Sequence, residues 1–387
     1  MTATATTIDS CRICGRPFFP RPLFRFRGMP AVAQNFPAAA EVEADRGTDF
    51  DVVQCSACGV VQLTCGPVAY HRDVIRAAAV SPEMADHRRR QFAEWVSAYR
   101  LRGRPVIEIG CGNGEYLLRL KEAGAVASGL EHNQAAVDAC RQQGLDVQQG
   151  FVESAAARIP GGPFDGFLML SCLEHLPDVN GALAGIRANL APQAVGLVEV
   201  PNFDMILAEK TVGEFMTDHL FYFTRETLET TLRLNGFEVL DCRPTWHDYI
   251  LTATVRSRSP LPVAEFEAVT SEVRGGIDHF LGRFPPRSVV VWGAGHQALA
   301  TLAIHELGDR IAYVVDSAAF KQNRFTPATH VPIRSPEQLR SDTEIRGVIV
   351  MGASYSDEIA RIIRRDYRPE LAVAILRPGS LETEAHA

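Results

Sequence analysis

Short apolar runs alternate with helix-period segments through the middle of the chain. The apolar runs have the length of buried strands, and turn residues bound them, at 106–109, 126–130, 146–150 and 164–170. The segments between them carry apolar side chains at helical spacing and end at a glycine, as in 115–124 and 134–144. A further helical segment is expected between residues 70 and 100. This alternation predicts a parallel, doubly wound α/β sheet, in which ligands bind at the carboxyl ends of the strands.

A similar alternation returns near the end of the chain. Residues 256–262 read Arg-Ser-Arg-Ser-Pro-Leu-Pro and predict a linker. Beyond it, further strands are expected at 288–292, 311–316, 347–352 and 371–376. We therefore expect a second, smaller Rossmann-like α/β unit and three parts in all, with bounds at 1–69, 70–258 and 259–387.

Composition narrows the class of protein. With 387 residues, 46% apolar and 22% charged, the chain is globular and long enough for several domains. A net charge of −7 and a pI near 5.9 argue against a nucleic-acid partner. No apolar run suits a membrane span, and no signal peptide is recognised, so we expect no membrane partner. Nine cysteines without an export signal indicate a cytoplasmic protein. Its partner would be a small molecule, and both a monomer and a homo-oligomer remain open.

Two Cys-x-x-Cys pairs mark the first part, which we expect at 1–69. Each pair is followed by a glycine that suits a tight turn around the sulfurs. Two such pairs supply four thiolates, the ligand set of a closed tetrahedral zinc site. The predicted ligands of a structural Zn²⁺ are Cys11, Cys14, Cys55 and Cys58. A redox pair and a fortuitous spacing are the alternatives.

A glycine-rich turn follows the first strand of the middle domain. Its three alternating glycines let the backbone turn tightly and approach a ligand. Glu131 closes the next strand about 20 residues on, where an acid can accept ribose hydroxyls. The spacing resembles the S-adenosylmethionine (SAM) site of class I methyltransferases more than a NAD fingerprint. The candidate residues of the turn are Glu108, Gly110, Cys111, Gly112, Asn113 and Gly114. The alternative is a loop–helix junction that binds nothing.

The carboxyl ends of the later strands supply further candidates. Phe151 and Val152 follow the third strand, where an adenine ring would pack. Ser171, Glu174 and His175 follow the fourth strand, in a segment similar to the one that lines the methionine end of SAM in methyltransferases. Glu174 and His175 either act directly or position this loop.

Chemistry is expected in the segment from 214 to 224. Asp218 precedes His219, and Tyr222 follows in an aromatic setting. A histidine near neutral pKa that a carboxylate orients is a natural general base. A packed histidine satisfied by the backbone is the alternative. Asn202, at the end of a fifth strand, is expected to face the substrate.

The last unit carries its own candidates for substrate binding. Glycines and a histidine follow its first strand, and three cations lie on a long segment after its second strand. The predicted residues are Gly293, Gly295, His296, Lys321, Arg324 and His330. Cations of this kind could hold a diphosphate. Equally, the unit could only brace the substrate cleft.

Together the three parts resemble the NDP-sugar C-methyltransferase family. The resemblance rests on the paired cysteines, EIGCGNG at 108–114, TDHLFYF at 217–223 and KQNRFTPATHVPI at 321–333. It implies a class I methyltransferase fold with an N-terminal zinc module and a C-terminal Rossmann-like domain that binds a nucleotide.

The resemblance also implies a reaction. The family methylates a ring carbon beside a ketone, commonly C3 of a 4-keto-6-deoxy sugar on a nucleoside diphosphate. His219 would be the general base, Asp218 its orienting group, and Tyr222 or His175 the group that holds the enolate oxygen.

Departures from the family pattern leave alternatives. Tyrosines that the family often carries are missing near Asp73 and at Met216, so the acceptor could differ. An O- or N-methyltransferase of a small metabolite and a non-catalytic SAM-fold partner are the competing hypotheses. A zinc-dependent nucleic-acid methyltransferase is disfavoured by the acidic pI.

Overall fold

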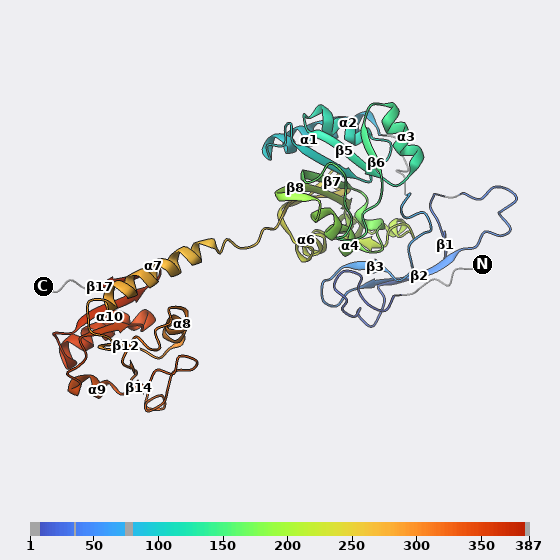
Figure 1. Ribbon diagram of the computed structural model, residues 1–387. Helices are drawn as coiled ribbons and strands as arrows, with labels where there is room; N and C mark the ends of the chain where they lie inside the picture. The colour runs from blue at the N-terminus through green and yellow to red at the C-terminus, as the bar shows by residue number, and fades with distance from the viewer. Residues whose placement is uncertain (1–7, 35, 74–79, 384–387) are drawn as a thin grey trace. The chain divides into compact units, whose positions relative to one another are not determined.

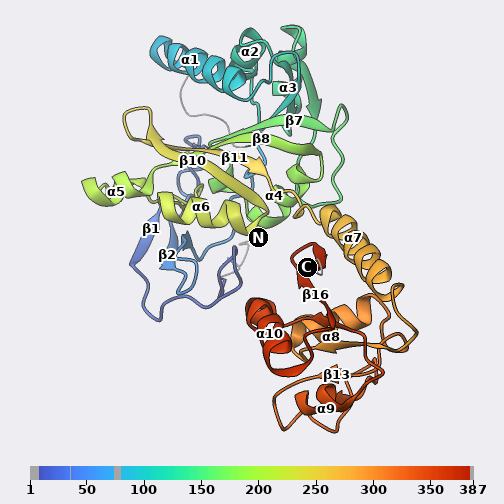
Figure 2. The same cartoon turned by 90° about the vertical axis from the view of Figure 1, so that its left-hand side faces the viewer.

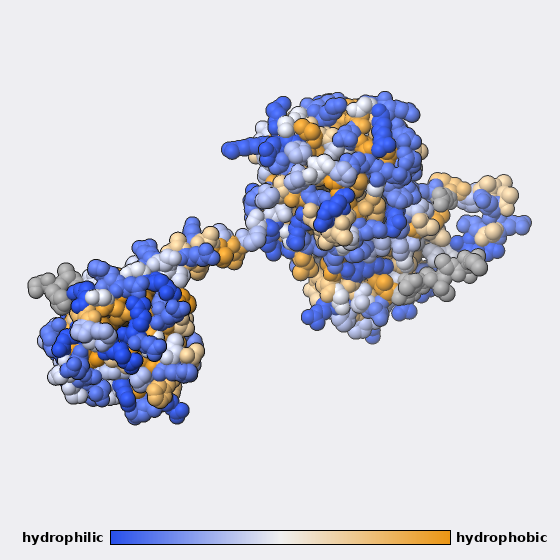
Figure 3. Space-filling model, in the orientation of Figure 1, coloured by the Kyte–Doolittle hydropathy of each residue, from blue (hydrophilic) through white to orange (hydrophobic). Residues whose placement is uncertain are grey.

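The computed structural model describes residues 8–34, 36–73 and 80–383. The chain forms two compact units, Met1–Ser259 and Pro260–Ala387, and each is described by itself. Polar residues cover most of the face drawn in Figure 3. Within the described residues, no helix has the length and apolar character needed to cross a membrane.

A seven-stranded sheet with the order β10-β11-β8-β7-β4-β5-β6 forms the centre of the first unit (Figure 1). Strands β4 to β8 pair in parallel, whereas β11 runs antiparallel to both β8 and β10. This arrangement confirms the predicted α/β class. The strands are β4 (Pro105–Ile109), β5 (Val126–Glu131), β6 (Asp146–Gln149), β7 (Phe164–Leu170), β8 (Leu190–Pro201), β10 (Phe237–Thr245) and β11 (Ile250–Ser257).

Helices cover both faces of this sheet (Figures 1 and 2). One face carries α1 (Pro82–Ala98), α2 (Glu115–Glu122) and α3 (Gln134–Gln142). The helix expected between 70 and 100 is found as α1, and positions 74–79 of that expectation lie outside the described residues. The opposite face carries α4 (Val179–Arg187) and α6 (Arg225–Leu234). Shorter helical segments are η1 (Leu173–His175), α5 (Phe203–Glu209) and η2 (Val212–Glu214).

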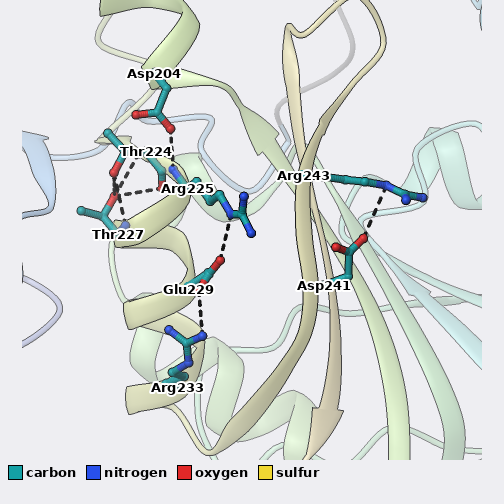
Figure 4. Close-up of polar contacts among 8 residues, drawn as sticks. All are labelled: Asp204, Thr224, Arg225, Thr227, Glu229, Arg233, Asp241 and Arg243. Atoms are coloured by element: carbon teal, nitrogen blue, oxygen red, sulfur yellow. Dashed lines mark hydrogen bonds and ion pairs between the residues drawn. The ribbon is translucent and has the colours of Figure 1, made fainter.

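Helix α6 begins at a reciprocal cap just after the segment predicted to carry the chemistry. The Thr224 hydroxyl accepts from the backbone N–H of Thr227, and the Thr227 hydroxyl accepts from that of Thr224 (Figure 4). Glu229 bridges Arg225 and Arg233, one helical turn away on either side (Figure 4). The cap fixes the residue at which α6 begins, because it satisfies backbone N–H groups at the helix N-terminus that have no partner within the helix. The segment before the helix therefore ends at a defined position.

A second sheet in the first unit has the order β1-β2-β3-β9. Its strands are β1 (Phe24–Met29), β2 (Thr48–Gln54), β3 (Val61–Leu63) and β9 (Phe221–Tyr222). Three of these strands come from the cysteine-bearing part of the chain, and β9 comes from residues just beyond His219. The Asn180 amide on α4 also donates to the Ile13 carbonyl over 2.8 Å. The cysteine-bearing segment is therefore joined to the rest of the first unit through β9, which completes the four-stranded sheet, and through the contact with α4.

The second unit contains a six-stranded sheet with the order β14-β13-β12-β15-β16-β17. All neighbours are parallel except β16 and β17. This strand order is that of dinucleotide-binding folds, in which the crevice opens where the order reverses, here between β12 and β15. The strands are β12 (Val289–Trp292), β13 (Val314–Val315), β14 (Ile333–Arg334), β15 (Gly347–Val350), β16 (Ala372–Arg377) and β17 (Ser380–Thr383). The helices are α7 (Ala264–Leu281), α8 (His296–Ile304), α9 (Pro336–Ser341), η3 (Ala353–Tyr355), α10 (Ser356–Ile362) and the π-helical turn η4 (Ile363–Tyr367).

Candidate active site

A cavity of about 800 Å³ opens at the carboxyl ends of β4, β5 and β7. Its volume lies in the range of small-molecule sites. The predicted residues that line it are Gly110, Cys111, Gly112, Asn113, Glu131, Phe151, Val152, Ser171, Glu174, His175, Asp218 and His219. Other predicted residues of the first unit lie outside the lining, namely Glu108, Gly114, Asn202 and Tyr222. The site predicted from the sequence is thus brought together around one cavity.

The glycine turn after β4 is tied to the acid at the end of β5. The backbone N–H of Gly112 donates to Oε2 of Glu131 over 2.9 Å, and that of Asn133 donates to Oε1 over 2.8 Å. An ionised carboxylate has about four acceptor sites, so two remain for ribose hydroxyls. A Cβ on Gly112 would meet nothing within 4 Å, whereas one on Gly114 would lie 2.5 Å from Leu145. Gly112 therefore leaves room for a ligand, and Gly114 allows helix α2 to pack closely.

Glu108 and Cys111 differ in how they relate to the cavity. Glu108 is buried beneath the turn with 2% exposure. Cys111 lines the cavity, and burial, together with the charge of Glu108, raises the pKa of its thiol. A thiol that stays protonated acts as a small apolar side chain here.

Side chains that the sequence did not mark as site residues pack against the Phe151 ring. The rings of His71 and His132 meet it edge-on at 6.3 and 6.0 Å between centroids. The Arg72 guanidinium lies over its face at 5.4 Å and pairs with Glu153. No motif marks residues 71 and 72, because they belong to a segment that reaches the cavity only through the fold. A ring that enters beside Phe151 would pack among aromatic edges and a cation.

Three groups meet at the other end of the cavity, where the chemistry was predicted. One carboxylate oxygen of Glu174 and one ring nitrogen each of His175 and His219 all lie within 4.8 Å of one another. The rings of His175 and His219 meet edge-on at 4.8 Å between centroids. Nδ1 of His175 forms a hydrogen bond of 2.7 Å with the backbone carbonyl of Asp218. Burial and the neighbouring His175 lower the pKa of His219 to about 3. His219 is therefore a neutral imidazole at ordinary pH.

The Asp218 carboxylate accepts a hydrogen bond from Tyr70, which is not among the predicted site residues. Oη of Tyr70 donates to Oδ1 of Asp218 over 2.8 Å and accepts from the backbone N–H of Ala33 over 2.8 Å. The geometry differs from the orienting contact expected between Asp218 and His219. Tyr70 lies three residues before Asp73, so the region in which a family tyrosine was expected to be missing does supply a phenol to the site, whereas position 216 is Met. Its signal in the sequence was only its position ahead of the sheet.

Two predicted residues support the backbone around the cavity. Oη of Tyr222 accepts from the N–H of Met216 over 2.9 Å and donates to the Glu214 carbonyl over 3.3 Å. The side chain of Asn202 caps α5 and donates to the Asp248 carbonyl over 2.7 Å. The structure therefore gives both side chains backbone partners, and neither lines the cavity.

The four predicted cysteines of the first part form one cluster. The sulfurs of Cys11 and Cys58 are 3.6 Å apart, those of Cys14 and Cys55 are 3.4 Å apart, and all four lie within 4.8 Å. Tetrahedral zinc with bonds of 2.3 Å requires sulfurs about 3.8 Å apart. The Gln62 amide donates to the Cys11 sulfur over 3.2 Å, a contact typical of groups around a metal site. The cluster could therefore hold a metal ion.

In the second unit, an acid that was not predicted lies against the glycine turn. Asp316, after β13, accepts from the N–H of Ala294 over 2.8 Å and from that of Ala318 over 2.9 Å. Lys321 pairs with it over 2.9 Å, and this contact and the two N–H donors hold its pKa low despite partial burial. A Cβ on Gly295 would meet nothing within 4 Å. Of the remaining predicted residues, His296, Arg324 and His330 are exposed, and Gly293 has φ +115.

Comparisons with known proteins agree with this arrangement. The family described as a methyltransferase domain matches residues 83–241, and the family described as a C-methyltransferase C-terminal domain matches 256–368. C-methyltransferase NovU of Streptomyces niveus is 24% identical over 374 residues, 86% of each chain. A ubiquinone biosynthesis O-methyltransferase of Azotobacter vinelandii is 33% identical over 91 residues, 22% of this chain and 39% of its own length. A solved magnesium protoporphyrin IX methyltransferase from Synechocystis, with bound S-adenosylhomocysteine (SAH), has a TM-score of 0.37 at 18% identity and covers 48% of this chain and 90% of its own.

The cavity at the glycine turn and the matched domains define a SAM-dependent methyltransferase. More closely, the chain carries a match to the C-methyltransferase C-terminal domain and is similar over 86% of its length to a C-methyltransferase. The resemblance inferred from the motifs is confirmed at the level of a SAM-dependent C-methyltransferase.

Proposed function

We propose that this C-methyltransferase acts on a nucleotide-linked keto-deoxysugar, commonly at C3 of a 4-keto-6-deoxy sugar, with His219 as the general base. The proposal rests on the motif resemblance and on the similarity, over 86% of the chain, to a protein named as a C-methyltransferase. The observation that carries it is a neutral histidine in the cavity that also holds the glycine turn and Glu131.

The cavity residues suit the two demands of methylation beside a ketone. A C–H bond beside a ketone is weakly acidic, so a base must take its proton and a donor must hold the enolate oxygen. His219 is neutral and therefore has a free lone pair, but a pKa of about 3 is far below the near-neutral value expected of a general base. The base role therefore requires that the negative charge developing on the enolate raise the pKa of His219. His175 lines the cavity and Tyr222 does not. The Nδ1–H of His175 is already donated to the Asp218 carbonyl, so His175 would hold the enolate oxygen only with a proton on Nε2.

SAM fits the residues at the other end of the cavity, and it supplies the methyl group on a cationic sulfonium. Glu131 would accept its ribose hydroxyls, Gly110 to Asn113 would approach its chain, and Phe151 would pack on its adenine. The four cysteines would hold a structural Zn²⁺, which the sulfur separations and the Gln62 contact support. None of the nine cysteines forms a disulfide.

The second unit would bind the nucleotide of the substrate. The strand order of its sheet, the open Gly295 and the acid Asp316 repeat the elements of a dinucleotide crevice. Lys321 and Arg324 lie on the segment after β13 and would approach the diphosphate.

The test is a methylation assay with SAM and a panel of dTDP-, GDP- and CDP-linked keto-deoxysugars, with the product identified by NMR. We expect a new C–CH3 group and, with the His219→Gln variant, loss of turnover while SAH still binds. In deuterated water without SAM, the wild type should exchange the proton beside the ketone and the variant should not. An O–CH3 product would support the competing O-methyltransferase hypothesis, and full turnover by the variant would remove His219 as the base.

A further inference from the structure

Glu174 is a buried acid that the mechanism above does not use. It lies on η1 with 1% exposure and lines the cavity. Within the described residues, its Oε2 has no hydrogen-bond partner. Its backbone carbonyl accepts from the N–H of Leu220 over 2.8 Å, which ties η1 to the residue after His219. An isolated buried carboxylate is costly, so its protonation state depends on what else enters the cavity.

The contact between Glu174 and His175 requires a shared proton. A carbonyl can only accept, so Nδ1 of His175 carries the hydrogen of its bond to the Asp218 backbone. In neutral His175 the other ring nitrogen, Nε2, is then an acceptor, and it faces Oε1 of Glu174 at 3.8 Å. Two acceptors that face each other in a dry site repel unless one holds a proton. The pair therefore carries one proton when the cavity contains no other charge.

The surroundings of Glu174 supply little other compensation. His219 is neutral, Glu199 on β8 is a second acid, and the Cys172 and Tyr249 side chains stay protonated because burial raises their pKa values. Burial raises the pKa of Glu174, Glu199 adds to this, and His175 opposes it. Within the described ranges, no lysine or arginine pairs with Glu174, so the cavity favours the protonated carboxyl group until a cation enters.

His219 needs a group of this kind next to it. Burial lowers the pKa of His219 to about 3, so the imidazolium that forms on proton abstraction does not keep its proton. The His175 ring packs on that of His219, and its Nε2 lies 3.8 Å from Oε1 of Glu174. One nitrogen of each ring and one oxygen of Glu174 all lie within 4.8 Å of one another. The 3.8 Å separation exceeds the length of a hydrogen bond, so transfer of the proton from His219 to Glu174 requires a small movement of these side chains or a bridging water.

We propose that Glu174 is the final acceptor of the proton that leaves the substrate carbon, and that it is ionised only while a cationic sulfonium occupies the cavity. The inference rests on the proposed function. A cation in the same dry cavity favours the carboxylate, so binding of SAM expels the proton of Glu174 to solvent, whereas binding of SAH, whose sulfur is a neutral thioether, does not.

The charges and atoms of this scheme balance. The C–H bond breaks, its electron pair stays on the substrate as an enolate, and the proton goes to His219. The enolate carbon forms its new bond to the methyl group, and the S–CH3 bond electrons return to sulfur, which becomes a neutral thioether. The proton then passes from His219 by way of Nε2 of His175 to Glu174. The site starts with one carboxylate and one sulfonium and ends with neither.

The experiment is calorimetric titration of the full chain with SAM and with SAH, near neutral pH, in two buffers of different ionisation enthalpy. The difference between buffers counts protons exchanged on binding. We expect SAM to release about one proton more than SAH per molecule bound. The Glu174→Gln variant keeps the shape of the side chain but cannot ionise, so its SAM–SAH difference gives the baseline from the ligands themselves. An equal proton count for SAM and SAH in the wild type would overturn the proposal without any variant.

This experiment separates the inference from the proposed function. It uses no sugar, so a wrong acceptor class leaves its result unchanged. Should the Glu174→Gln variant bind SAH poorly, the Glu174→Asp variant, which can still ionise, should show the same SAM-specific proton release as the wild type. Release that persists undiminished in Glu174→Gln would assign the proton to another group and exclude Glu174.

Discussion

Three acids around the cavity are compensated in three different ways. Glu131 accepts from two backbone N–H groups, Glu199 pairs with a buried arginine, and Glu174 has only His175 within 4 Å as an ionisable partner among the described residues. The surroundings of each carboxyl group suit it to a different role. Fixed hydrogen-bond donors favour the charged form of a carboxyl group, whereas without them the favoured form depends on the ligand that is bound. Glu131 is therefore suited to binding, Glu199 to holding the fold, and Glu174 to accepting a proton.

The Glu131→Ala change should weaken SAH binding. It removes the acceptors for two ribose hydroxyls and releases Gly112, so we expect a loss of about 2–3 kcal/mol, roughly 30- to 150-fold in Kd. Calorimetric titration measures it. The matched control is Asp316→Ala, which removes the equivalent acid of the second unit and should leave SAH binding unchanged. A Glu131→Ala variant with wild-type affinity would contradict the ribose assignment.

The Arg88→Met change should destabilise the first unit. Arg88 and Glu199 are 1% and 0% exposed and pair over 2.6 Å, so removal of the cation leaves a buried, uncompensated charge that costs about 3–5 kcal/mol. Urea unfolding measures it. As the control, Arg243→Met removes an exposed pair with Asp241 (Figure 4) and should cost under about 1 kcal/mol. A small effect of Arg88→Met would contradict a stabilising role of this buried ion pair.

Among the elements, β9 connects the cysteine cluster to the cavity. It pairs with β3, and the N–H of Leu63 donates to the Leu220 carbonyl over 3.0 Å, one residue after His219. Gln62, on β3, donates its amide to Cys11. A metal that holds the cluster together would therefore also hold the segment that carries His219.

Loss of a metal ion from the cysteine cluster should therefore loosen the segment that carries His219. The Cys55→Ser variant should lose zinc, increase amide exchange at Leu220 and Phe221, and lower turnover more than SAH affinity. Metal analysis and hydrogen exchange measure these effects. Cys65→Ser is the matched control, because Cys65 is a buried thiol outside the cluster. One zinc per chain in Cys55→Ser would contradict the ligand set, and unchanged exchange at β9 would contradict the coupling.

Across the whole molecule, the two units repeat one arrangement. In each, an acid after the second strand accepts from the backbone of the glycine turn after the first, Glu131 from Gly112 and Asp316 from Ala294. Such an acid is the usual partner of ribose hydroxyls. This repeat supports the proposal that each unit binds one nucleoside.

The Asp316→Ala change should weaken binding of nucleoside diphosphates to the full chain by about 10-fold or more, because ribose contacts and the anchor of Lys321 are lost. Titration with dTDP, GDP and CDP measures it, and SAH binding by the same variant shows that the first unit is intact. Nucleotide binding that survives in Asp316→Ala would place the nucleotide elsewhere.

The sequence by itself determined the α/β class, the glycine turn, the acid at 131 and the two cysteine pairs, because each depends on residues close together in the chain. The tertiary structure alone decided which distant groups meet. Tyr70 reaches Asp218 across 148 positions, β9 joins the N-terminal sheet, and Glu174 faces Nε2 of His175 without a cation beside it. Those contacts depend on how strand ends and loops pack around the cavity, and burial there shifts pKa values in ways that no local pattern encodes.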